Sequence, residues 1–111
     1  MMKGQLDLAL TEYRKSAQLD PSFAFPYLNI ANIQMQTKNI PAAIENFEKA
    51  LSINPAMPAV HLSLGVVYHQ FQGNKEKALE HLKESLRLAP KQQRAESTQS
   101  LIQELENKQP T

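Results

Sequence analysis

The sequence contains no cysteine and no tryptophan, and its charge is nearly balanced. The lack of cysteine excludes disulfides, thiolate metal sites and cysteine nucleophiles, and it fits a reducing compartment. Twelve Lys and Arg stand against eleven Asp and Glu, a formal net charge of +1, and neither half of the chain is markedly biased. Because phosphate binding needs Lys and Arg clustered on one face, this balance argues against a nucleic-acid or anionic-membrane partner.

Long apolar segments are also missing. The longest charge-free run lies between Lys49 and Lys75, and prolines, histidines and amides interrupt it, so the sequence predicts no membrane span. The N-terminal residues alternate polar and apolar side chains instead of forming the apolar core of a signal peptide. We therefore expect a cytoplasmic protein whose 111 residues form one small domain.

What the sequence does contain is an internal repeat. Four columns of residues recur in one register, at intervals of 34 and then 35 residues. The columns are Pro21, Pro55 and Pro90; Ala9, Ala43 and Ala78; Tyr13, Phe47 and Leu82; and Ser16, Ala50 and Ser85. A period of this length indicates repeated helical units, each of which buries its apolar face against its neighbours.

The repeat resembles the tetratricopeptide repeat, a helix-turn-helix unit of about 34 residues with the pattern W-x2-L-G-x2-Y, then A-x3-F, then P. The second copy reads Tyr27-x2-Ile30-Ala31-x2-Gln34, Ala43-x3-Phe47, Pro55, and the third reads His61-x2-Leu64-Gly65-x2-Tyr68, Ala78-x3-Leu82, Pro90. Gln34 and His61 depart from the tyrosine and tryptophan columns. The resemblance implies an all-α fold, a right-handed α-solenoid of antiparallel helix pairs.

The register predicts about two and a half repeats in a single domain. Residues 1–21 supply only the second helix of a repeat, residues 24–57 and 58–91 are complete repeats, and residues 92–107 resemble a capping helix. The extra residue of the last interval should lie in the turn at 71–74, because turns accept insertions and helices do not. The predicted helices are residues 4–18, 24–37, 41–53, 58–72, 75–88 and 92–107.

The first helices of the two complete repeats, at 24–37 and 58–72, contain no Asp, Glu, Lys or Arg. At about 100° per residue, Tyr27, Ile30 and Ala31 share the face that packs on the partner helix, and a second face lies about 130° away. The resemblance implies that this second face lines a concave, peptide-contacting groove. The groove residues are then Phe25, Leu28, Asn29, Asn32, Met35 and Gln36 from the first helix, and Leu62, Val66, His69 and Gln70 from the second.

Two functional hypotheses follow, and both require a protein partner. In the first, the groove captures a largely apolar, uncharged peptide, as an adaptor or scaffold, and its amides bond the peptide backbone because each amide offers a donor and an acceptor. In the second, the chain is a structural self-assembly element that forms a homo-oligomer. Its apolar groove and the open flank of the half repeat, at Leu6, Leu10 and Tyr13, would then pair with a second copy.

Catalysis and chaperone recognition are both disfavoured. No HExxH, phosphate-binding loop or nucleophile elbow is present, and His61 fills the large-residue column as a core residue, so we expect no enzyme, no cofactor and no metal. Some relatives of this kind hold the C-terminal carboxylate of heat-shock chaperones with a clamp of Lys, Asn and Arg. Only Asn29 matches that clamp, since Ala59 and Ser63 stand at the later Lys and Arg positions.

Overall fold

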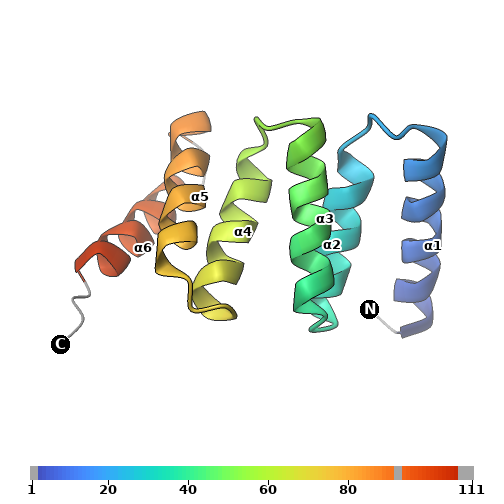
Figure 1. Ribbon diagram of the computed structural model, residues 1–111, viewed down its shortest axis with the longest axis horizontal. Coiled ribbons are helices and arrows are strands. Elements are labelled where there is room, and N and C mark those ends of the chain that lie inside the picture. The colour runs from blue at the N-terminus through green and yellow to red at the C-terminus, as the bar shows by residue number, and fades with distance from the viewer. Residues whose placement is uncertain (1–2, 92–93, 108–111) are drawn as a thin grey trace. The chain divides into compact units, whose positions relative to one another are not determined.

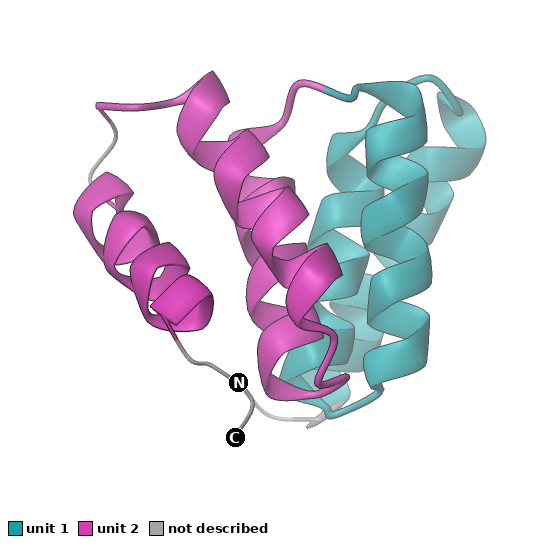
Figure 2. Ribbon diagram, turned by 60° about the vertical axis from the view of Figure 1, so that its left-hand side comes forward, with its two compact units in different colours: residues 1–55 teal, residues 56–111 magenta. Residues whose placement is uncertain are grey.

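A computed structural model describes residues 3–91 and 94–107 of the chain (Figure 1). These residues form six α-helices and no strand, so the predicted all-α class is confirmed. The helices are α1 (Lys3–Leu19), α2 (Phe25–Gln36), α3 (Ile40–Ile53), α4 (Pro58–Gln70), α5 (Lys75–Leu88) and α6 (Ala95–Asn107). The chain divides into two compact units, Met1–Pro55 with α1 to α3 and Ala56–Thr111 with α4 to α6 (Figure 2).

Proline sets the ends of several helices. Pro21, Pro55 and Pro90 each lie two residues beyond the end of a helix, because the residue before a proline is displaced from helical geometry. The helices α2, α3 and α4 each have a proline in their first turn, where an N–H group would have no helical partner. The repeated prolines thus separate the helices as their spacing predicts.

Two helix boundaries were predicted wrongly. The helix expected over 58–72 ends at Gln70, because the N–H of Asn74 donates to the carbonyl of Tyr68 at 2.9 Å and Gly73 takes a left-handed φ of 59°. The helix expected over 92–107 begins at Ala95; the carbonyl of Arg94 accepts its first hydrogen bond, from the N–H of Thr98 at 2.9 Å. Residues 92 and 93 lie outside the described residues.

The turns inside the two helix pairs differ in length. Residues 37–39 join α2 to α3, and residues 71–74 join α4 to α5, so the second turn has one residue more. In the first turn Lys38 has a φ of 65°, and the N–H of Asn39 donates to the carbonyl of Gln34 at 2.8 Å. This is the six-to-one bond of a Schellman cap, which normally places glycine at the left-handed position.

In unit 1, α2 packs against α3 and α1 packs against α2 (Figure 1). Ala31, Ala43 and Phe47 are fully buried, which confirms that the small columns mark a close approach of two helices and that an aromatic residue fills the space beside it. Gln34, in the tyrosine column, is buried as well, and its Oε1 accepts a hydrogen bond of 2.9 Å from Nδ2 of Asn46. That bond satisfies the buried carbonyl oxygen of the Gln34 side chain.

In unit 2, α4 packs against α5, and α5 also contacts α6. A Cβ atom added to Gly65 would lie 2.6 Å from Cγ of Leu82 and 3.2 Å from the carbonyl oxygen of Ala78. The backbones therefore approach as the sequence predicts. The buried hydroxyl of Ser85 donates to the carbonyl of Pro58 at 2.9 Å, which fixes α5 against the first turn of α4.

Candidate functional site

The six groove residues predicted on α2 lie outside the core of unit 1. Phe25 is 53% exposed, and its ring lies 5.6 Å from that of Phe23 at a tilt of 60°. By contrast, Ile30 and Ala31 on the packing face of the same helix are buried. Leu28, Asn29 and Met35 are half-buried, and Asn32 and Gln36 are exposed. The division of α2 into a packing face and a second face therefore agrees with the helical spacing.

The polar side chains of this second face are not used by the fold. Within the described part of the chain, Asn29, Asn32 and Gln36 make no side-chain hydrogen bond. The packing-face amide of Gln34 is instead bonded to Asn46. The three outer amides therefore keep both their donors and their acceptors available.

The face predicted on α4 borders the last helix of unit 2. Leu62, Val66 and His69 are half-buried and Gln70 is exposed. A pocket of about 200 Å³ lies between α4 and α6, and its walls include Leu62, Val66, Thr98 and Leu101, with Arg94 also lining it. The sequence marked the apolar side of α6 but missed this pocket, because no repeat column specifies where a capping helix lies against α4.

The histidines form a buried contact instead of a catalytic arrangement. His61 is buried, and its Nδ1 lies 3.0 Å from Nδ1 of His81. One nitrogen must donate and the other accept in this hydrogen bond, so at least one of the two rings is neutral. The ring of His81 also stacks on Tyr68, with centroids 5.8 Å apart and planes 9° from parallel, and Nζ of Lys77 lies 5.2 Å from the centroid of Tyr68.

This contact confirms the interpretation of His61 as a core residue. His81 lies on the charged helix α5, where it is half-buried and its ring faces that of His61 on α4. Among the described residues, no three side chains of His, Cys, Asp or Glu are grouped so as to hold a metal ion. In the same part of the chain, every helix is too short or too polar to cross a membrane.

The charges of unit 2 lie on exposed helix surfaces. Nζ of Lys83 and Oε2 of Glu106 form an ion pair of 2.8 Å that joins α5 to α6. One turn further along α5, Arg87 pairs with Glu84. The hydrogen bond from Arg87 lowers the pKa of the Glu84 carboxyl, and the same bond raises the pKa of Arg87. Exposed pairs of this kind are screened by water and stabilise the fold little.

The flank predicted on α1 is less buried than the cores of the other helices. Leu6, Leu10 and Tyr13 are all half-buried. Ala17 is the one buried residue in the described part of α1, while Leu8 is 61% exposed and Leu19 is 80% exposed. An apolar surface therefore runs along α1 that the rest of unit 1 covers only in part.

Comparison with known proteins identifies the repeat. One family model, described as a TPR repeat, matches residues 31–70, and a second, the tetratricopeptide repeat, matches residues 58–92. In Arabidopsis thaliana, Protein CTR9 homolog is 33% identical over 73 residues, which are 66% of this chain and 7% of that protein. Anaphase-promoting complex subunit 6 from the same plant is 36% identical over 86 residues, 72% of this chain and 16% of that protein. The chain thus corresponds to a small part of both relatives.

A solved structure, the first TPR of Spaghetti (RPAP3) bound to the HSP90 peptide SRMEEVD, has the same fold. Its TM-score is 0.80 at 19% sequence identity, and the match covers 94% of this chain and 81% of that one. With six helices and no strand in the described residues, this likeness confirms the predicted helical-repeat solenoid.

Proposed function

The chain belongs to the tetratricopeptide repeat family, and from this membership we propose that it is a protein-protein interaction module that binds a largely apolar, uncharged peptide segment. The binding residues in this proposal are those of the second faces of α2 and α4, one face in each unit. The protein catalyses no reaction in this proposal. It acts as an adaptor or scaffold.

The observation that carries the proposal is a set of polar side chains without partners. Five of the ten predicted groove residues are amides or imidazoles that make no side-chain hydrogen bond within the described part of the chain: Asn29, Asn32, Gln36, His69 and Gln70. Each residue of a bound peptide brings one N–H donor and one carbonyl acceptor. Neutral groups that donate and accept can bond such a backbone without demanding a charged ligand.

The apolar members of the two faces would supply the anchoring contacts. On α2 the exposed ring of Phe25 lies about one helical turn from Leu28 and about three turns from Met35. On α4 the pocket beside Leu62 and Val66 is lined mainly by apolar atoms and offers a place for one apolar side chain. Interfaces draw most of their binding energy from a few such buried anchors, surrounded by contacts that exclude water.

The absence of charge on both faces distinguishes the proposed ligand from the acidic peptide of the solved relative. That relative holds SRMEEVD, whereas here α2 and α4 contain no Lys or Arg, and Ala59 and Ser63 stand where the chaperone clamp has its later cations. The name of the relative that is a subunit of the anaphase-promoting complex supports a scaffold role within a larger assembly.

Selection from a displayed library of random peptides, followed by affinity measurement on synthetic copies, tests the proposal. We expect enriched sequences to be apolar and uncharged. Phe25→Glu and Leu62→Glu should each weaken their binding by about tenfold or more, because both place a charge against apolar ligand surface. Leu19→Glu is the matched control, since Leu19 is more exposed than Phe25 and lies outside both faces.

Circular dichroism of each variant separates lost binding from lost folding. Enrichment of acidic peptides, or equal affinity of the folded Phe25→Glu, Leu62→Glu and Leu19→Glu proteins, would refute the proposal. Loss of binding confined to the first two variants would support it.

The apolar surface of α1 favours a second candidate function, that of a self-assembly element. Leu6, Leu10 and Tyr13 are only half-buried within unit 1, and a second copy of the chain could cover them. In this case sedimentation from micromolar to millimolar concentration should reveal a dimer or larger species, and Tyr13→Glu should reduce it to a monomer. A monomer across the whole range excludes this function.

A further inference from the structure

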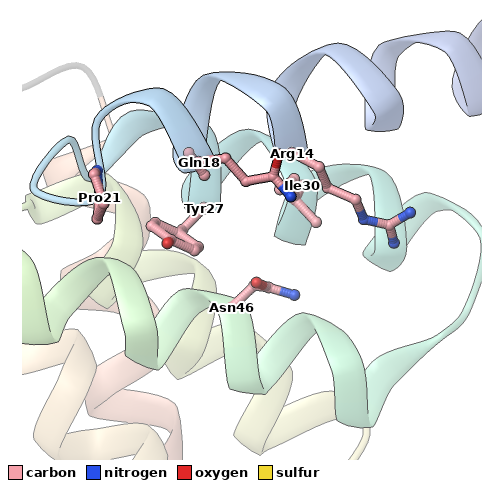
Figure 3. Close-up of a pocket in the computed structure, with 7 residues that line it drawn as sticks. Arg14, Gln18, Pro21, Tyr27, Ile30 and Asn46 are labelled. Atoms are coloured by element: carbon pink, nitrogen blue, oxygen red, sulfur yellow. The ribbon is translucent and has the colours of Figure 1, made fainter.

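The proposed peptide faces leave one feature of unit 1 unexplained, a pocket of about 420 Å³ where α1, α2 and α3 meet. This volume lies within the usual range of ligand pockets, about 300 to 1,000 Å³. Figure 3 shows side chains from three helices around one trough: Arg14 and Gln18 on α1, Tyr27 and Ile30 on α2, and Asn46 on α3. Ala17 and Pro21 complete the lining.

The pocket is separate from the peptide face proposed above. Tyr27 and Ile30 belong to the packing face of α2, about 130° around the helix from Leu28, Asn32 and Met35 at about 100° per residue. None of the ten residues of the proposed peptide faces lines the pocket. A ligand here would therefore be bound independently of a ligand on the other face.

Arg14 is the charged residue among those that line the pocket. Arg14 is exposed and has no ion pair or hydrogen bond with any described residue, and the residues three and four positions away on α1 are Leu10, Thr11, Ala17 and Gln18. Nζ of Lys49 lies 5.9 Å from the centroid of the Tyr27 ring. No Asp or Glu lines the pocket, so its field favours an anionic ligand.

The pocket also contains two polar side chains, those of Asn46 and Gln18. Both amide hydrogens of Asn46 are used, one toward Oε1 of Gln34 at 2.9 Å and one toward the carbonyl of Ala42 at 3.1 Å. The carbonyl oxygen of that amide thus keeps its capacity to accept a hydrogen bond. Gln18 on α1 makes no side-chain hydrogen bond with the described residues. The site therefore offers a cationic donor, a fixed acceptor and an apolar floor of Ala17, Pro21, Tyr27 and Ile30.

We propose that this pocket binds a segment of a partner protein in which an acidic side chain stands next to an aliphatic one. The carboxylate bonds the guanidinium of Arg14, whose planar fork matches two carboxylate oxygens. A backbone N–H of the segment donates to Asn46, and the aliphatic side chain covers Tyr27 and Ile30. Charge complementarity selects this ligand over the uncharged peptide of the other face, and the proposal stands whether or not that other face binds.

The probe is a blocked peptide, acetyl-Gly-Leu-Glu-Leu-Gly-amide, titrated into the full chain labelled with ¹⁵N. We expect a dissociation constant of about 1 mM or tighter, with shifts in the side-chain amide resonances of Gln18 and Asn46 and in Nε–H of Arg14. The same peptide with Gln in place of Glu should bind about tenfold more weakly, because it loses a charge-assisted bond. A third peptide, with Gln and a free C-terminal carboxylate, tests whether a chain end suffices.

Arg14→Gln should weaken binding of the Glu peptide by about fivefold or more, a lower limit that allows for the exposure of Arg14. Lys15→Gln removes the same charge from the next residue of α1, which is exposed and does not line the pocket, and should leave the affinity unchanged. Both positions are exposed, so both variants should fold.

The proposal is overturned if the two variants weaken binding equally, if the Gln peptide binds as well as the Glu peptide, or if only the free C-terminus binds. It is also overturned if the resonances of Gln18 and Asn46 shift with protein concentration alone, since a second copy of the chain would then be the occupant. Shifts confined to Asn29 and Asn32 would place the ligand on the other face and contradict this site.

Discussion

Gln34 and Asn46 are joined by a side-chain hydrogen bond of 2.9 Å between α2 and α3. The residues at the same repeat positions in unit 2 are Tyr68 and His81, which stack as parallel rings. Where Gln34 replaces the tyrosine of the repeat pattern, the facing residue Asn46 is an amide that can donate a hydrogen bond to it. At this position a hydrogen bond between amides joins α2 to α3, and stacked rings join α4 to α5.

We expect Asn46→Ala to lower the free energy of unfolding by about 1–2 kcal/mol, because Oε1 of the buried Gln34 loses its donor. Urea unfolding measures the change. Gln36→Ala removes an exposed amide at the last residue of α2 and should change the stability by less than about 0.5 kcal/mol. If the double variant of Gln34→Ala and Asn46→Ala shows no coupling energy, the bond contributes nothing.

Gly65→Ala should destabilise unit 2 by about 1–3 kcal/mol through overpacking. The added Cβ would lie 2.6 Å from Cγ of Leu82, so α4 and α5 must separate or Leu82 must leave its rotamer. Gly4→Ala is the contrasting control, since no atom lies within 4 Å of its Cβ position and alanine favours a helix. Equal melting temperatures for Gly65→Ala and the parent chain would contradict the observed approach of the helices.

Gly73→Ala should also destabilise the fold, by about 1 kcal/mol, but for a different reason. There is space for a Cβ at this position, yet the φ of 59° disfavours one. Gly73→Asn should therefore lose less stability, because asparagine tolerates the left-handed region better than alanine. Thermal unfolding of the two variants distinguishes the two causes. If backbone strain decides, Gly73→Asn is the more stable variant; if steric overlap decides, Gly73→Ala is the more stable one, because Asn is larger.

His81→Ala should cost about 1–3 kcal/mol, because it removes the hydrogen bond to the buried His61 and the stacking on Tyr68. His69→Ala is the matched control on α4, where the half-buried imidazole has no side-chain partner among the described residues. Chemical denaturation compares the two. A larger loss for His69→Ala would show that the His61–His81 contact does not stabilise unit 2.

The repeat columns predicted the core because they record side-chain size, and size decides how closely two helices pack. Ala31, Ala43 and Phe47 are buried for this reason. The helix ends were predicted less well where the turn differs between the copies. The apolar pattern of α4 continues to Phe71, but the helix ends at Gln70, and the turn that follows contains the left-handed residue Gly73.

The sequence could not predict the two pockets. Arg14 and Asn46 match no repeat column, and they line one cavity only because α1 and α3 both pack near α2. Leu101 meets Leu62 and Val66 in the same way, through the placement of α6.

Tyr27 and Asn46 occupy the same repeat positions as His61 and His81. The two imidazoles of unit 2 bond each other, whereas Tyr27 and Asn46 stand on the walls of a cavity. The same pair of repeat positions therefore forms an interior contact in one copy and borders a cavity in the other. Asn46→His would place an imidazole on the wall opposite Tyr27, at the position that His81 holds opposite His61 in unit 2, and would reduce the volume of the cavity.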